Sequence, residues 1–186
     1  GIERPARTIY DVLVGDVFLV ARQTSIDDTL GSDGVVGHTQ SERTNKLRTI
    51  RIDTVPAIDP QPDLPDGAAS DWSIVQTPAA SKMSKAAYHF AMGLVNEVDV
   101  PVGVVDLNMG IYFPIGWMSR DTLLETSKFY GHTSVDGVVK RFDRITDALR
   151  QGEPMPEKEH IQSNPLSYPL YPAVGYNGVL HPLRSL

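Results

Sequence analysis

The chain has 186 residues, 41% of them hydrophobic and 22% charged, which is typical of one globular domain, so we expect residues 1–186 to form a single domain. Its formal net charge of -6 and its lack of basic runs argue against nucleic-acid or membrane-surface binding, and no apolar run is long enough for a transmembrane helix. It contains no cysteine, which excludes disulfides, thiolate catalysis and cysteine-based zinc sites.

The first predicted element is a β-strand over residues 12–21, where the sequence is almost continuously apolar. The strand breaks into Arg22, Gln23, Thr24 and Ser25, which predicts a tight turn. Open α/β sheets place ligands and nucleophiles at the carboxyl ends of such strands. The hydroxyl group of Thr24 or Ser25 is therefore a candidate nucleophile that a distant His would activate. The alternative is that both hydroxyls only cap the next element, as Ser and Thr commonly do.

A second strand is predicted over residues 47–55, where apolar and polar residues alternate. Residues 56–70 contain four prolines and predict a surface excursion, whose length suggests packing against another element. Ser84 is the predicted N-cap of a helix. The apolar stripe of this helix, at helical spacing, comprises Ala87, Phe90, Leu94 and Val98.

A continuous apolar run over residues 100–107 predicts a buried parallel strand. Ser119 is the predicted N-cap of a helix that carries Leu123 and Leu124. A further helix is predicted to end at Gly152. Its apolar positions are Val138, Phe142, Ile145 and Leu149. The Pro-rich residues 153–186 are expected to wrap around a surface.

The alternation of strands and helices predicts an α/β fold with a mostly parallel sheet. About three strands can be recognised, which is few for a parallel sheet that has to be covered on both faces. We therefore expect an incomplete sheet, equivalent to the first half of a doubly wound domain.

Three segments, in the right order, resemble the sialate O-acetylesterase family of SGNH (GDSL-type) hydrolases. Residues 12–26 resemble the family's VLVGDVW run and its G-Q-S-N-M nucleophile motif, with Arg22 at the position of Gly and Thr24 at that of the nucleophilic Ser. Residues 100–119 resemble a VPVGLI strand that is followed by a Gly-Gly-Thr segment and a W-M-S run. Residues 176–183, YNGVLHPL, resemble the family's YNGMIHPL.

The resemblance implies a three-layer α/β/α, flavodoxin-like fold with the strand order 2-1-3. It also implies a carbohydrate O-acetylesterase that acts through a hydroxyl nucleophile and an oxyanion hole. Thr24 or Ser25 would be the nucleophile, and the N–H group of Gly110 would bind the oxyanion. The residues expected to contact the acetylated carbohydrate are Arg22, Gln23, Asn108 and Tyr112. No metal and no cofactor are expected, and the resemblance alone favours a periplasmic or secreted location.

The catalytic base is expected to come from outside this chain. The family's catalytic His lies in a D-x-x-H-P motif, whereas Gly178 stands three residues before His181. Asn177 and Gly178 are instead predicted to form a turn. The chain also begins with Gly rather than Met, so we expect a processed product or a fragment. The predicted partner is the C-terminal remainder of the same precursor, or a second chain, pairing with the edge of the strand at residues 100–107.

A second class of function stays open, in which the chain is an inactive relative that binds carbohydrate or a partner protein. Arg22 could bind the carboxylate of an acidic sugar in a bidentate contact. Ile111, Tyr112 and Phe113 stand where the family has small residues, and they would narrow a pocket. These differences fall at the positions that the family uses for catalysis.

Overall fold

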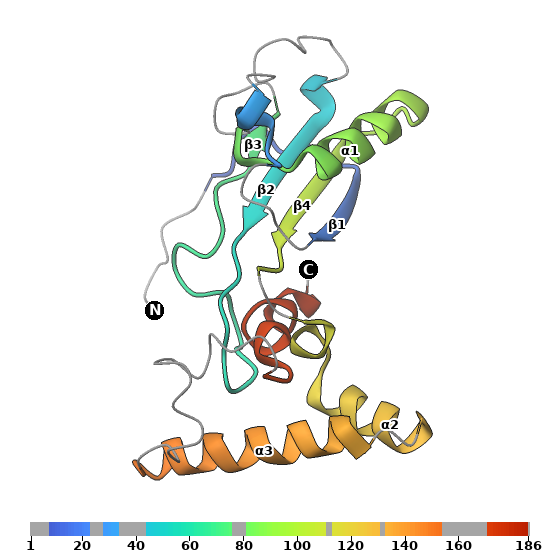
Figure 1. Ribbon diagram of the computed structural model, residues 1–186. Coiled ribbons are helices and arrows are strands. Elements are labelled where there is room, and N and C mark those ends of the chain that lie inside the picture. Colours follow the sequence, from blue (N-terminus) through green and yellow to red (C-terminus); the bar gives the residue numbers. More distant parts are fainter. Residues whose placement is uncertain are drawn as a thin grey trace. The chain divides into compact units, whose positions relative to one another are not determined.

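The computed structural model describes residues 8–22, 28–33, 44–75, 81–110, 113–130, 133–153 and 171–185 (Figure 1). The chain divides into two compact units, which we describe one at a time. The first unit comprises residues 1–20, 26–50 and 71–106, and the second comprises residues 21–25, 51–70 and 107–186.

Four strands form one open sheet in the order β1-β4-β2-β3. The strands are β1 (Asp16–Arg22), β2 (Leu47–Ile52), β3 (Ser73–Ile74) and β4 (Val102–Asn108). β1 and β4 run parallel, because the Asp16 N–H donates to the Pro101 carbonyl at one end and the Met109 N–H donates to the Arg22 carbonyl at the other. β3 pairs with β2 in the antiparallel direction. The prediction of an α/β fold with an open sheet is confirmed.

The predicted strand order 2-1-3 is wrong. That order places the first strand in the centre, whereas the structure places β4 between β1 and β2. The physical reason is burial: five of the seven residues of β4 are buried, but none of those in β1 is. The free edge predicted at residues 100–107 is therefore wrong as well, and the edge on that side of the sheet is β1. β1 also begins four residues later than predicted, since Val12 and Val14 are exposed before it.

The first helix, α1 (Lys85–Glu97), begins as predicted. The Ser84 hydroxyl accepts a hydrogen bond from the Ala87 N–H at 3.0 Å. Of the predicted apolar stripe, Ala87 is buried and Leu94 and Val98 pack against the core, whereas the position of Phe90 was wrong, because its side chain is 44% exposed. The buried residues of α1 are Ala87, Tyr88, Ala91 and Val95. The small Ala87 and Ala91 allow the helix to approach the sheet closely, and Phe90 contacts Phe18 edge-on, with ring centroids 5.4 Å apart.

A buried carboxylate anchors α1 to the sheet. Asp106, in β4, has no exposed surface, and it accepts hydrogen bonds from the Ser84 N–H at 2.7 Å and the Ser84 hydroxyl at 3.2 Å. A buried charge requires such partners. The sequence analysis did not identify this contact, although one acid inside a β-branched run is a signal for it.

The second unit contains α2 (Arg120–Tyr130) and α3 (Thr133–Arg150), which contact each other. Both were predicted. The Ser119 hydroxyl accepts from the Thr122 N–H at 3.1 Å, and Gly152, with φ of 71°, follows the end of α3. Shorter helical segments span Leu30–Asp33, Thr44–Lys46, Pro114–Trp117, Tyr176–Leu180 and Pro182–Ser185. The turn predicted at Asn177 and Gly178 is wrong, because both residues are helical.

Candidate functional site

The predicted nucleophile turn is only partly described. Gln23, Thr24, Ser25 and Tyr112 lie outside the described residues. Arg22, Asn108 and Gly110 are described, and they lie together in the second unit. The site is therefore built from the strand ends that flank the nucleophile turn.

Hydrogen bonds hold the carboxyl ends of three strands side by side. The Met109 N–H donates to the carbonyl of Arg22, the last residue of β1, at 2.7 Å. The Thr54 hydroxyl, just beyond β2, donates to the carbonyl of Asn108, the last residue of β4. The carboxyl edge of a parallel sheet is the usual position of a ligand site in α/β proteins. Thr54 was not singled out in the sequence, where it lay inside the predicted second strand.

Position 110 requires a glycine for two reasons, its left-handed backbone conformation and the closeness of Thr54. Its φ is +62°, and a Cβ atom at this position would lie 3.2 Å from the Thr54 hydroxyl oxygen. The Gly110 N–H donates to the Asn108 side-chain oxygen at 2.9 Å. The group predicted to bind an oxyanion is thus engaged within its own turn, and Asn108 has to release it before it can serve a ligand.

Arg22 stands at a position where the tight turn that carries a nucleophile favours a small residue. Its side chain is half-buried, and both terminal guanidinium nitrogens are shielded from solvent. Arg22 stands two residues before Thr24 in the chain, and a cation of this kind can attract an anion.

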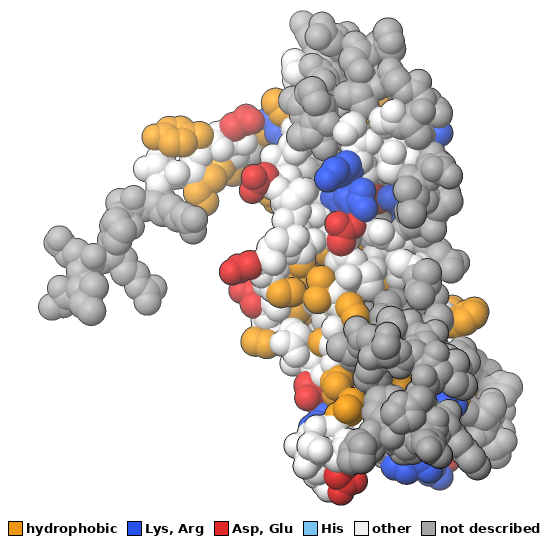
Figure 2. Space-filling model, turned by 60° about the vertical axis from the view of Figure 1, so that its left-hand side comes forward, with side chains coloured by type: hydrophobic (Ala, Val, Ile, Leu, Met, Phe, Trp, Pro, Cys, Tyr) orange, Lys and Arg blue, Asp and Glu red, His pale blue; other side chains and the backbone are white. Residues whose placement is uncertain are grey.

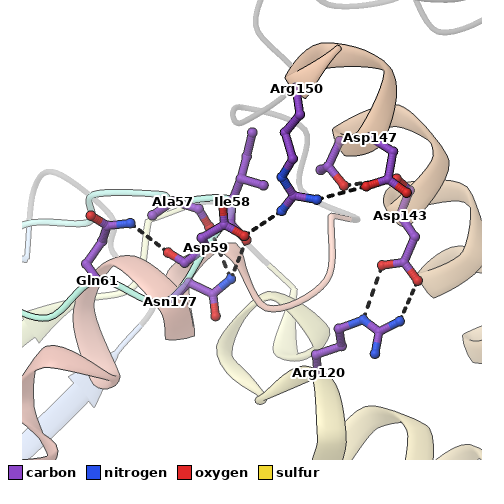
Figure 3. Close-up of polar contacts among 10 residues, drawn as sticks. Ala57, Ile58, Asp59, Gln61, Arg120, Asp143, Asp147, Arg150 and Asn177 are labelled. Carbon is purple, nitrogen blue, oxygen red and sulfur yellow. Dashed lines mark hydrogen bonds and ion pairs between the residues drawn. The ribbon is translucent and has the colours of Figure 1, made fainter.

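The second unit also contains a polar groove of about 940 Å³. It is lined by residues 58–60, by the start of α2 and by the C-terminal half of α3. Several residues between 172 and 184 complete the lining. Figure 3 shows the charged side chains of this region converging from α2, α3 and the loop that contains Asp59.

The Tyr-Asn-Gly segment, residues 176–178, builds one wall of the groove. The Asn177 side-chain amide donates to the Ile58 carbonyl at 2.7 Å (Figure 3). The Gln61 N–H donates to the Asn177 carbonyl at 2.9 Å. A Cβ atom on Gly178 would lie 1.7 Å from the Val55 carbonyl oxygen. Gly178 is therefore needed for close approach of the helix to the loop after β2, rather than for a turn.

Ion pairs cross the groove. Arg150 contacts Asp59 at 2.5 Å and Asp147 at 2.9 Å, while Arg120 contacts Asp143 at 2.5 Å (Figure 3). The hydrogen bond that Arg120 donates to Asp143 raises the pKa of Arg120 above its ordinary value, and the bond that Arg150 donates to Asp59 does the same for the pKa of Arg150. The groove therefore presents fixed charges of both signs.

His181 lies in the same groove with a defined tautomer. Its Nδ1 atom is 2.9 Å from the Gln61 carbonyl oxygen, which can only accept a hydrogen bond. Nδ1 consequently carries the proton in the neutral ring, and Nε2 is left as the acceptor. The Tyr176 ring contacts the imidazole edge-on, with centroids 6.1 Å apart.

Within the described ranges, no three acidic or His side chains come together as a metal site would need. None of the described helices has both the length and the apolarity to cross a bilayer.

Comparison with known proteins relates the fold to that of a solved structure. No family model matches the sequence, and no curated protein matches it. The fold is similar to the crystal structure of a carbohydrate acetylesterase from Xanthomonas citri, with a TM-score of 0.54 and 20% sequence identity. The match covers 92% of this chain and 30% of the acetylesterase, so this chain spans less than a third of that protein. The α/β fold of a carbohydrate acetylesterase is thereby shown for this chain, as a likeness of fold alone.

Proposed function

We propose that this chain forms part of a carbohydrate O-acetylesterase domain of the sialate O-acetylesterase type. The supporting observation is the convergence of Arg22, Asn108 and Gly110 at the carboxyl ends of β1 and β4. The candidate nucleophiles Thr24 and Ser25 follow directly after β1 in the chain. The fold that it shares with a carbohydrate acetylesterase supports the same reaction class.

The proposed reaction is a two-step acyl transfer. The hydroxyl oxygen of Thr24 or Ser25 attacks the acetyl carbonyl carbon, and a His outside these 186 residues accepts the hydroxyl proton. The Gly110 N–H, released by Asn108, binds the oxyanion. Collapse of the intermediate breaks the bond to the sugar oxygen, which takes the proton from that His. Water then attacks the acetyl-enzyme and releases acetate.

Alanine substitutions at the two hydroxyls test this function. The measurement is acetate release from p-nitrophenyl acetate. The protein used is the native-length polypeptide, that is, the full-length natural protein that contains this chain. Thr24→Ala or Ser25→Ala, but not both, is expected to lower kcat by a factor of about 10³ or more. Ser73→Ala, in β3, is the control and should leave the rate unchanged. Equal, near-normal rates in both variants would exclude a hydroxyl nucleophile here.

A carbohydrate-binding module without catalysis is the second candidate, and the polar groove favours it. Sugar hydroxyls both donate and accept hydrogen bonds, so they match a surface on which carboxylates and guanidinium groups alternate. The engagement of the Gly110 N–H by Asn108 also suits a site that performs no acyl transfer.

Binding measurements separate the two candidates. Isothermal titration with sialyllactose and with lactose, its neutral parent disaccharide, is performed on the native-length polypeptide. Loss of binding in Arg184→Ala, which removes an exposed groove cation, would locate the ligand in the groove. Loss in Arg22→Ala alone would locate it at the strand ends. Arg51→Ala is the control, because Arg51 pairs with Asp53 and does not line the groove. Saturable binding without acetate release would support the binding module.

A further inference from the structure

The first unit exposes an unusual amount of apolar side-chain surface. Val14 and Val17 are 89% and 64% exposed, and Leu19 and Trp72 are each 49% exposed. Hydrophobic side chains open to solvent are visible on the face drawn in Figure 2. An apolar surface of this kind marks an interface.

Val17, Leu19 and Trp72 share one face of the sheet. Phe18 and Val20, in β1, pack against the core beneath α1, so the alternate residues Val17 and Leu19 point to the opposite face. A Cβ atom on Gly103 of β4 would lie 3.2 Å from Val17 and 3.4 Å from Trp72, which places Trp72 over the same face.

A hollow of about 340 Å³ lies between this outer face and residues 9–13. Its lining is mainly apolar and includes Val17, Trp72 and Gly103. Parallel sheets are normally covered on both faces. In the described part of the first unit, α1 covers the inner face and no α-helix covers the outer face. On that outer face Val105 of β4 is buried, so the exposed apolar surface lies over β1, at Val17 and Leu19.

Among the described strands β1 lies at the edge of the sheet, and this edge adjoins the same face. The Asp16 N–H and the Arg22 carbonyl both point toward β4. Because backbone polar groups alternate along a strand, those of Val17, Leu19 and Ala21 point away from β4, to the open edge. A strand that is apolar on both faces is typical of the interior of a parallel sheet, not of its margin.

We propose that a further parallel strand pairs with the free edge of β1 and that its connecting helix covers Val17, Leu19 and Trp72. Both elements would belong to the same polypeptide, outside these 186 residues. A parallel neighbour needs a crossover connection, and that connection is a helix lying on a sheet face. One additional strand with its helix would therefore pair with the edge of β1 and also cover the exposed side chains beside it.

Two observations favour this occupant over a second copy of the chain. A two-fold axis at β1 would pair two antiparallel strands and leave both outer faces without a helix. The acetylesterase with the similar fold extends well beyond the matched part, which is 30% of its length.

Cysteine accessibility tests the proposal, because the chain has no native cysteine. Leu19→Cys or Val17→Cys is introduced into the native-length polypeptide, and the rate of maleimide labelling is measured. The control is Gly93→Cys on α1, where an added Cβ meets no atom within 4 Å. Each rate is compared with that of the same variant in the isolated 186-residue chain.

In the native-length polypeptide, Leu19→Cys is expected to label about tenfold or more slowly than in the isolated chain, because its exposure then requires local opening. Gly93→Cys is expected to label equally fast in both. Val17→Cys repeats the test if Leu19→Cys does not fold. Equal labelling of the two sites in the native-length polypeptide would overturn the proposal. So would a native polypeptide that ends at Leu186, or an isolated chain that is a dimer in which Leu19→Cys is protected.

Discussion

At the scale of single residues, Gly178 offers the sharpest test of the packing. Gly178→Ala is expected to destabilise the protein by about 2–3 kcal/mol, because the methyl group would overlap the Val55 carbonyl. Gly137→Ala, in α3, has no atom within 4 Å of the added Cβ and should stabilise it by about 0.5–1 kcal/mol. Urea unfolding followed by circular dichroism measures both. Similar effects of the two substitutions would contradict the close approach at Gly178.

Asp106 provides a second residue-scale prediction. Asp106→Ala removes the acceptor of the Ser84 N–H and hydroxyl and is expected to cost about 2–4 kcal/mol of unfolding free energy. Asp66→Ala, at an exposed position, is the control and should change the stability by less than about 0.5 kcal/mol. The same urea titration compares the variants, and a cost at Asp106 no larger than that at Asp66 would exclude the anchoring role.

Local signals in the sequence predicted some residues and not others. Ser84 and Ser119 were identified as N-caps because capping depends on residues three positions apart. The hydrogen bonds from Ser84 to Asp106 and from Thr54 to Asn108 join residues 22 and 54 positions apart. No local pattern encodes such pairs, so these contacts became visible only in the folded chain.

At the scale of elements, the ion pair between Lys46 and Asp99 makes the stability of the fold depend on pH. Lys46 hydrogen-bonds Asp99 at 2.6 Å and lowers the pKa of that carboxyl from its ordinary value of 3.8. A lowered folded-state pKa stabilises the fold above the unfolded-state pKa, and this stabilisation is lost as the pH falls through the folded-state value.

The Lys46→Met variant tests the direction in which this stabilisation changes with pH. Its melting temperature is expected to lie slightly below that of the wild type near pH 7, with the difference shrinking as the pH falls below the ordinary carboxyl pKa of 3.8. The effect should be small and should decrease in high salt, because the Asp99 side chain is fully exposed. A difference that grew as the pH fell would contradict the assignment.

Helix and strand positions were easier to predict than their partners. Apolar periodicity located α1 and α3, but it did not show that α1 buries Tyr88 and Ala91 rather than Phe90. The face of a helix depends on what covers it, and two small residues there allowed close approach to the sheet. The strand order failed for the same reason, because β1 and β4 are both apolar and only their pairing decides which is central.

At the scale of the whole molecule, strand–helix alternation was sufficient to predict the α/β class. The groove could not be predicted, because it joins Asp59 to Arg150, which lie 91 residues apart. A charge pattern along the sequence does not show which carboxylate meets which guanidinium. The groove therefore adds a candidate site to the strand ends that the sequence indicated.

The central claim is that a hydroxyl in the turn after β1 is an acyl-transfer nucleophile. A fluorophosphonate probe reacts with such an activated hydroxyl, and trypsin releases the turn in one peptide, residues 23–43, between Arg22 and Arg43. We predict that the native-length polypeptide is labelled in this peptide, at Thr24 or Ser25, as located by tandem mass spectrometry. An unlabelled 23–43 peptide, under conditions in which a control serine esterase is labelled, would contradict the esterase account.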